Sequence, residues 1–206
     1  MLSPRPDLLP LRPVAFWWRF AVILLVGGAG VSPCLRADPA DSPPRSERQV
    51  KAAYIYNFGR FIAWPEASRR STPGPFKIGV LGDDLLADEL ASLLSDRSIR
   101  DHVIEVVRIR TPEDLLPLRI LVIGEIDLTR WAPALNTLRD RPVLIVGSAP
   151  DFARATGHIG FYVADQRVRF AINPATLRRS NLQASSRLLS LALVVDTDPV
   201  TASPAP

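Results

Sequence analysis

Three short apolar runs constrain the fold of this chain more than any other feature of its sequence. Residues 76–81, 120–123 and 143–146 are mostly apolar, and each run leads into a glycine that is followed by a polar residue. Runs of this length that are rich in Ile, Val and Leu are typical of strands buried on both faces of a sheet. Amphipathic segments lie between them, so the sequence predicts an α/β fold, a three-layer α/β/α sandwich around a mostly parallel sheet.

The first amphipathic segment, residues 46–63, is predicted to be a helix. Ser46 is a favourable N-cap residue, and Pro65 prevents continuation of the helix. Apolar side chains at helical spacing form a stripe for the core, and they are Val50, Tyr54, Phe58 and Phe61, flanked by Ile55 and Ile62. The other elements predicted before residue 158 are a helix over 85–94 capped by Asp83 or Asp84, a strand over 103–109, a helix over 128–138 and a helical turn over 151–155.

After residue 158 the pattern changes to an alternation of apolar and polar residues, which predicts a C-terminal β-hairpin. Its strands are residues 159–163 and 168–172, joined by a turn at Asp165-Gln166. This register sets Phe161 opposite Phe170 and Tyr162 opposite Arg169. We expect the hairpin to form an antiparallel edge of the sheet.

The residues after the hairpin are predicted to form a last helix, from Pro174 to Val195, with a break near Ser180-Asn181. On this helix Leu182, Leu189 and Leu193 would share one face with Ser186.

Residues 1–37 have the pattern of a secretory signal peptide. Arginines precede an apolar or glycine run, residues 20–31, that is shorter than the roughly 20 residues needed to span a membrane. Cleavage after Ala37 leaves a polar linker over 38–46, one domain over 47–195 and a disordered tail over 196–206. An uncleaved signal anchor is the alternative for the first segment. A lipoprotein is disfavoured because Pro33 precedes Cys34.

The charge of the chain also depends on that first segment. The 206 residues carry a formal net charge of +4, with 25 basic and 21 acidic side chains. Cleavage after Ala37 removes four arginines and one aspartate and leaves a nearly neutral chain. The sequence therefore does not predict nucleic acid as a partner. Cleavage after Ala37 also removes Cys34, the single cysteine. Neither a disulfide framework nor a cysteine-based zinc site is therefore expected.

The familiar catalytic and cofactor-binding motifs do not occur in the sequence. There is no glycine-rich phosphate loop, no H-E-x-x-H and no G-x-S-x-G, and His102 and His158 stand apart from other metal-ligand residues. We therefore expect no enzyme activity, no cofactor and no metal. A hydrolase with an unrecognised site, in which Asp83 takes part, is kept as a hypothesis.

The three strand ends supply the candidates for a ligand site. Asp83, Glu125 and Ser148 follow the glycines that end the apolar runs. In an open α/β sheet such ends line the crevice in which ligands bind, and two carboxylates with a hydroxyl could hold a cation or a polar ligand. The alternative is that these residues only form turns and cap helices.

Two other groups are candidates for binding a partner protein. Tyr56 and Arg60 are neighbours on the first helix, on a face that Ala52 and Gly59 would leave shallow. Tyrosine and arginine are enriched at interface hot spots. On the hairpin, Tyr162, Arg167 and Arg169 could share the outward face and receive an anion or an acidic surface. The alternatives are a solvated pair on the helix and an edge strand protected by charge on the hairpin.

Residues 51–65, KAAYIYNFGRFIAWP, resemble the opening signature of the YfiR family of exported bacterial regulators. Residues 76–82, the VRFAIN stretch at 168–173 and the NLQASSRLLSLA stretch at 181–192 are similar to later parts of the family pattern. The resemblance covers roughly residues 48–195. Two departures are the lack of the cysteine pairs common in the family, which argues against redox control, and Asn181 where the family favours glycine.

The resemblance implies a periplasmic regulator without catalysis. The best-known member binds the periplasmic domain of an inner-membrane diguanylate cyclase and holds it inactive, and an outer-membrane lipoprotein can sequester that member. Other members lie near sensor kinases or are fused to them. The cyclic dinucleotide is then made by the partner in the cytoplasm and is not expected as a ligand. The alternative function is a periplasmic small-ligand sensor, and the sequence leaves the partner, the direction of regulation and a homodimer open.

Overall fold

The computed structural model describes residues 46–65, 74–115, 117–149, 151–155 and 157–196. The predictions for the signal peptide and most of the linker and tail concern residues outside these ranges. The main sheet has the strand order β10-β8-β7-β6-β5-β2-β4-β3. Its strands are β2 (Phe76–Leu81), β3 (Ser98–Ile99), β4 (His102–Ile109), β5 (Ile120–Ile123), β6 (Leu144–Gly147), β7 (Ile159–Ala164), β8 (Arg167–Ile172) and β10 (Leu193–Val194).

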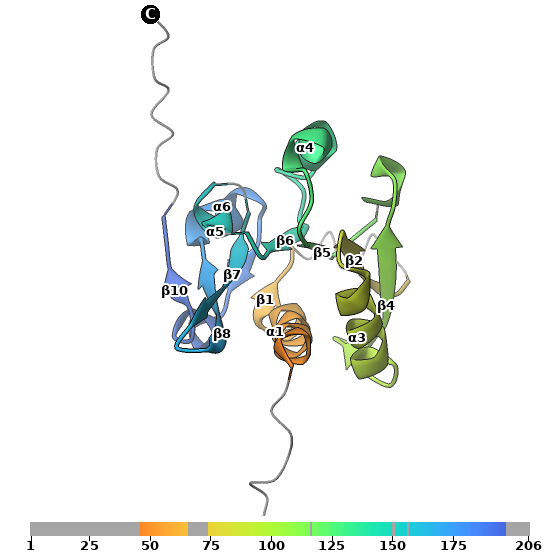
Figure 1. The fold of residues 1–206 in the computed structure, drawn as a ribbon, viewed down its shortest axis with the longest axis horizontal. Coiled ribbons are helices and arrows are strands. Elements are labelled where there is room, and N and C mark those ends of the chain that lie inside the picture. Colours follow the sequence, from red (N-terminus) through yellow and green to blue (C-terminus); the bar gives the residue numbers. More distant parts are fainter. Residues whose placement is uncertain (1–45, 66–73, 116, 150, 156, 197–206) are drawn as a thin grey trace, which may run out of the picture. The chain divides into compact units, whose positions relative to one another are not determined.

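Helices cover both faces of this sheet, as Figure 1 shows. They are α1 (Glu47–Phe61), α3 (Asp84–Leu94), the 3₁₀ helix η2 (Pro112–Leu115), α4 (Leu128–Asn136), α5 (Phe152–Ala155), α6 (Pro174–Arg179) and α7 (Ser186–Leu189). Helices α1 and α3 lie on one face, and α4 lies on the other. The predicted α/β/α sandwich is therefore confirmed.

The directions of the strands match the prediction of a mostly parallel sheet. Strands β4, β2, β5, β6 and β7 run parallel to one another, as expected for apolar runs separated by helices. The hairpin has the predicted register, with Phe161 opposite Phe170 and Tyr162 opposite Arg169. The prediction that the hairpin forms the edge is wrong, because β10 pairs in parallel with the end of β8 at Ala171 and Ile172.

Helix α1 begins with a capping box. Ser46 accepts a hydrogen bond from the backbone N–H of Gln49, and the Gln49 side chain accepts one from the backbone N–H of Ser46. After Phe61 the chain continues as β1 (Ile62–Ala63), which pairs antiparallel with β9 (Gln183–Ala184). The start of α1 is thus defined by a local capping box, and its end leads into a strand that pairs with a segment distant in the sequence.

The face of α1 that carries Ala52 and Gly59 is not the shallow surface that we predicted. Both residues are buried, and a Cβ at Gly59 would overlap the side chain of Ile99. Small residues on this helix therefore allow close packing against the segment after α3 rather than leaving a flat area for a partner.

The core of α1 is a group of aromatic rings. The Phe58 ring lies 5.8 Å from that of Phe161 and 5.1 Å from that of Phe170, between ring centroids. Tyr54 contacts the same two rings at 6.2 Å and 5.2 Å. Aromatic pairs at such distances stabilise a fold beyond the burial of their apolar area. This cluster therefore attaches α1 firmly to the hairpin.

The predicted C-terminal helix is wrong beyond Arg179. Asn181 adopts a left-handed conformation with φ of 54°, which ends α6, and the Leu182 N–H donates to the Leu177 carbonyl at 2.8 Å. The break that we expected near Ser180-Asn181 therefore ends the helix, which does not resume after it. The chain then forms β9, the short helix α7 with Ser185 as its N-cap, and β10.

We predict that Phe58→Ala lowers the free energy of unfolding by about 3–5 kcal/mol, because it leaves a cavity among rings that cannot close around it. Urea denaturation followed by circular dichroism measures this loss. Phe58→Leu retains most of the volume and should cost clearly less. A loss below about 1 kcal/mol for Phe58→Ala would contradict the role of this ring.

Candidate functional site

The three strand ends lie at one groove, although their spacing in the sequence did not establish that they are neighbours. Asp83, Glu125 and Ser148 line a space of about 380 Å³ together with the start of α1. The remaining lining residues are Ser46, Glu47, Arg48, Lys51, Gly82 and Gly124. The groove therefore lies at the carboxyl ends of β2, β5 and β6, the usual position of ligands in open α/β sheets.

Positive and negative side chains alternate in this groove. Lys51 Nζ lies 2.7 Å from a Glu47 carboxylate oxygen, and Arg48 Nε lies 3.9 Å from Asp83 Oδ1. Asp83 also accepts the backbone N–H of Leu86 at 3.0 Å and so caps α3. Both roles considered for Asp83, the helix cap and the groove wall, are present at once.

Glu47 and Glu125 are both exposed carboxylates of this groove, and Glu47 is paired with Lys51. Among the described residues, no group of three or more His, Cys, Asp or Glu side chains is placed to hold a metal ion. The groove is lined by polar and charged side chains of both signs.

Tyr56 and Arg60 are in contact on the solvent side of α1. The guanidinium carbon of Arg60 lies 5.6 Å from the centre of the Tyr56 ring. Arg97, which follows α3, lies 5.1 Å from the same ring. Arg60 and Arg97 are exposed and Tyr56 is half-buried. No sequence pattern links Arg97 to Tyr56, because the contact depends on how α3 packs against α1.

The hairpin candidates lie on another surface. Phe161 and Phe170 face α1, so the alternation of side chains puts Tyr162 and Arg169 on the opposite face of the sheet. Arg169 forms an ion pair with Asp165 at 3.6 Å, and Arg167 is exposed opposite Ala164. The five candidates for partner binding are therefore divided between two faces.

His158 has a structural position that sequence reasoning missed. It is buried, its Nδ1 accepts the N–H of Ile145 at 2.9 Å, and its Nε2 lies 2.9 Å from Ser180 Oγ. Ser180 in turn donates to the Arg139 carbonyl at 2.7 Å. Because Nδ1 accepts, the neutral ring carries its proton on Nε2. Burial, together with the nearby charge of Arg179, lowers the pKa of His158 from 6.5 to about 4.

The family model described as YfiR/HmsC-like matches residues 48–193, which is most of the chain. The chain belongs to the YfiR/HmsC-like family. The match includes the groove, α1 with Tyr56 and Arg60, and the hairpin. A search of the curated proteins finds no match. None of the described helices has both the length and the apolar character needed to cross a bilayer.

The lowered pKa of His158 predicts a stability that falls in acid. Between pH 6.5 and about 4 the unfolded chain binds a proton that the folded chain excludes, so the free energy of unfolding decreases as the pH falls through this window. Each pKa unit is worth about 1.4 kcal/mol, which makes the full loss about 3 kcal/mol.

Urea denaturation at a series of pH values measures this effect. His158→Gln keeps an acceptor for Ile145 and a donor for Ser180, and it should reduce the dependence of stability on pH in this window even if it lowers overall stability. An unchanged slope in His158→Gln would contradict the assignment.

Proposed function

We propose that this chain is a non-enzymatic periplasmic regulator, exported by a signal peptide that is cleaved after Ala37. It binds the periplasmic domain of an inner-membrane signalling protein, a diguanylate cyclase or a sensor kinase, and represses its output. Membership of the YfiR/HmsC-like family supports this proposal. The product of a cyclase partner, cyclic-di-GMP, is then made on the other side of the membrane. An outer-membrane lipoprotein is the proposed second partner, which would relieve the repression.

The observation that carries the proposal is the contact between Tyr56, Arg60 and Arg97 at the surface of α1. Tyrosine and arginine supply much of the binding energy at protein interfaces. Here the ring holds two arginine side chains in place before a partner arrives, which reduces the entropy lost on binding. We therefore assign partner binding first to this surface, and only second to Tyr162, Arg167 and Arg169 on the hairpin.

The non-enzymatic part of the proposal is supported by the structural tasks of the acid–base groups. Asp83, the residue of the hydrolase hypothesis, caps α3 and faces Arg48. His158 is buried, and its ring nitrogens contact Ile145 and Ser180. Both groups thus have structural roles, Asp83 as a helix cap and His158 as a buried hydrogen-bonding residue.

A second candidate function is a small-ligand sensor that uses the groove at the strand ends. The observation that favours it is the convergence of Asp83, Glu125 and Ser148 in one space of about 380 Å³. This volume falls within the range of roughly 300–1,000 Å³ that is usual for small-molecule sites. In this alternative a small polar molecule binds the exported chain and partner binding is secondary.

The regulator proposal predicts capture of a membrane signalling protein. The exported chain with a C-terminal affinity tag, incubated with detergent-solubilised bacterial inner membranes, should retain a cyclase or kinase that has a periplasmic domain. Tyr56→Ala combined with Arg60→Glu should abolish this capture, since it removes the ring and reverses a charge. Circular dichroism and a melting curve check that the variant is folded, because Tyr56 is half-buried. Full retention by the folded variant would refute the assignment of the surface.

The sensor alternative predicts a rise in melting temperature with a small ligand. A screen of nucleotides, amino acids and anions should give at least one shift, because a ligand at about 100 times its Kd stabilises by roughly 2.7 kcal/mol. Glu125→Ala should remove the shift while leaving the melting temperature without ligand nearly unchanged, since Glu125 is exposed. The absence of any shift across the screen argues against this alternative.

A further inference from the structure

A third arginine extends the contact between Tyr56, Arg60 and Arg97. Arg60 also lies over the ring of Phe61, at 5.8 Å from its centre, and Arg187 of α7 lies 5.5 Å from the same ring. Because Arg60 touches both rings, the contacts form one continuous surface. We call the three arginines with Tyr56 and Phe61 the arginine surface.

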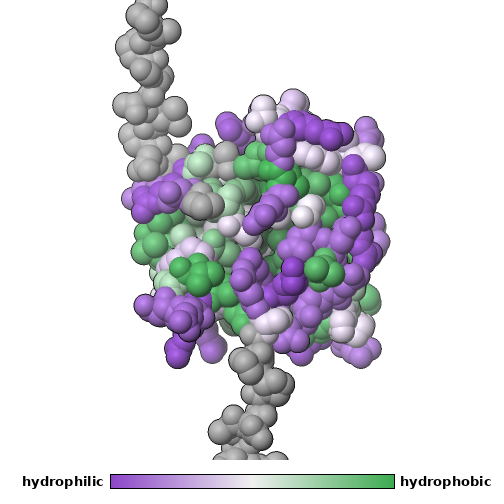
Figure 2. All heavy atoms as spheres, viewed as in Figure 1, coloured by the Kyte–Doolittle hydropathy of each residue, from purple (hydrophilic) through white to green (hydrophobic). Residues whose placement is uncertain are grey.

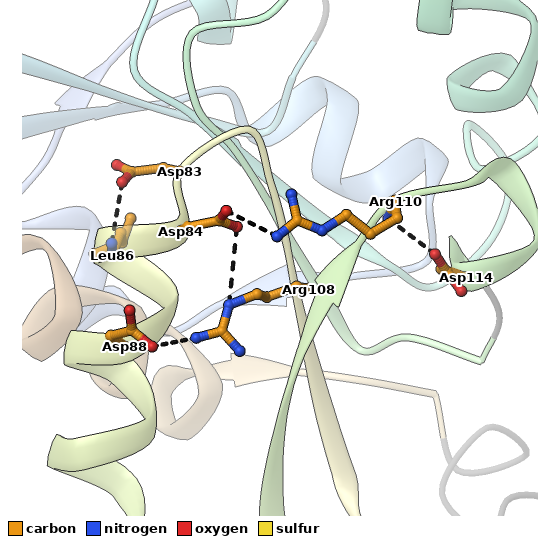
Figure 3. Close-up of polar contacts among 7 residues, drawn as sticks. All are labelled: Asp83, Asp84, Leu86, Asp88, Arg108, Arg110 and Asp114. Atoms are coloured by element: carbon orange, nitrogen blue, oxygen red, sulfur yellow. Dashed lines mark hydrogen bonds and ion pairs between the residues drawn. The ribbon is translucent and has the colours of Figure 1, made fainter.

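These arginines differ from others at the surface of the chain. On the α3 and β4 side, Arg108 forms ion pairs with Asp84 and Asp88, and Arg110 lies 2.8 Å from Asp84, as Figure 3 shows. Their charge is thus already matched within the chain. Figure 2 shows how hydrophilic side chains gather on this side of the molecule.

Arg60, Arg97 and Arg187 take part in none of the ion pairs that the described residues form. Asp96 is next to Arg97 in sequence, but its carboxylate lies 3.5 Å from Ser95 Oγ. All three arginine side chains are exposed. The arginine surface therefore carries three positive charges that no carboxylate of the described residues pairs with.

The way these side chains are held leaves them ready to bind an acid. A guanidinium group stacked on an aromatic ring keeps its N–H donors in the plane of the group, where they remain free for hydrogen bonds. Two such donors match the two oxygens of a carboxylate. The rings restrict the arginines beforehand, so less side-chain entropy is lost when a partner binds.

We propose that the arginine surface receives an acidic segment of the partner protein, whose Asp and Glu carboxylates pair with Arg60, Arg97 and Arg187. This inference rests on the proposed function and specifies the chemistry of the partner. A protein segment fits better than an anionic membrane, because Tyr56 and Phe61 are half-buried rather than protruding. An interfacial membrane site requires exposed apolar side chains that enter the lipid.

The test uses two sets of substitutions that change the net charge equally. R60Q/R97Q/R187Q neutralises the arginine surface, and R108Q/R110Q/R154Q neutralises three arginines that have ion-pair partners. The probe is a fluorescein-labelled oligo-glutamate peptide, and binding to the exported chain is followed by fluorescence anisotropy at low and high salt. An oligo-glutamine peptide and vesicles with anionic lipid are tested in parallel.

We expect the exported chain and the R108Q/R110Q/R154Q control to bind oligo-glutamate equally. R60Q/R97Q/R187Q should bind about tenfold more weakly or worse, and salt should weaken the binding that remains. Equal weakening by both sets would show an effect of net charge and overturn the inference. Binding of anionic vesicles through these arginines, without binding of oligo-glutamate, would overturn it in favour of a membrane surface.

The inference and the proposed function can fail separately. If R60Q/R97Q/R187Q still captures the signalling protein from solubilised membranes, the regulator function is supported. The arginine surface is then not the site that binds an acidic segment of the partner. If oligo-glutamate binding depends on these arginines but no signalling protein is captured, the surface stands and the regulator function fails.

Discussion

The packing of Phe58 against Phe161 and Phe170 is the contact on which both candidate sites depend. It attaches α1 to the sheet in a fixed position. The start of α1 then forms a wall of the groove at the strand ends, while its last turns carry Arg60. Because one helix presents both surfaces, the buried rings determine where each of them lies.

The distribution of charge separates the structural arginines from those proposed to bind a partner. Asp84 and Asp88 of α3 neutralise Arg108 of β4 and Arg110, which directly follows β4, and these contacts join a helix to a neighbouring strand. At the arginine surface, Tyr56 and Phe61 of α1 hold arginine side chains against their rings without neutralising the charge. Exposed ion pairs add little to stability, so the absence of partners at the arginine surface costs the fold little. The lack of paired carboxylates leaves the positive charge of these arginines available for an acidic partner.

Much of the fold follows from local patterns in the sequence. Strands β2 and β5 have the predicted bounds, since an apolar run and a following glycine define them. Asp83, one of the two predicted cap residues, caps α3, and the alternation along the hairpin sets its register. The convergence of the strand ends does not follow from the sequence alone, because it depends on the order β6-β5-β2 within the sheet.

The features that were missed depend on contacts between distant segments. Leucines after Asn181 have a spacing that suits a helix, but the left-handed Asn181 and the burial of Leu182 direct the chain into β9. Gly59 is buried because Ile99, which follows α3, and Phe76 of β2 pack against it. Arg97 and Arg187 join the arginine surface by the same kind of tertiary packing, which no local pattern encodes.

The most direct test of the account is a hydrogen–deuterium exchange footprint of residues 38–206 bound to the proposed signalling partner, compared with the same residues free. The account predicts slower exchange in the peptides that contain residues 54–63, 95–100 and 185–190, which carry the arginine surface. Slower exchange confined to the hairpin, residues 159–172, would contradict it.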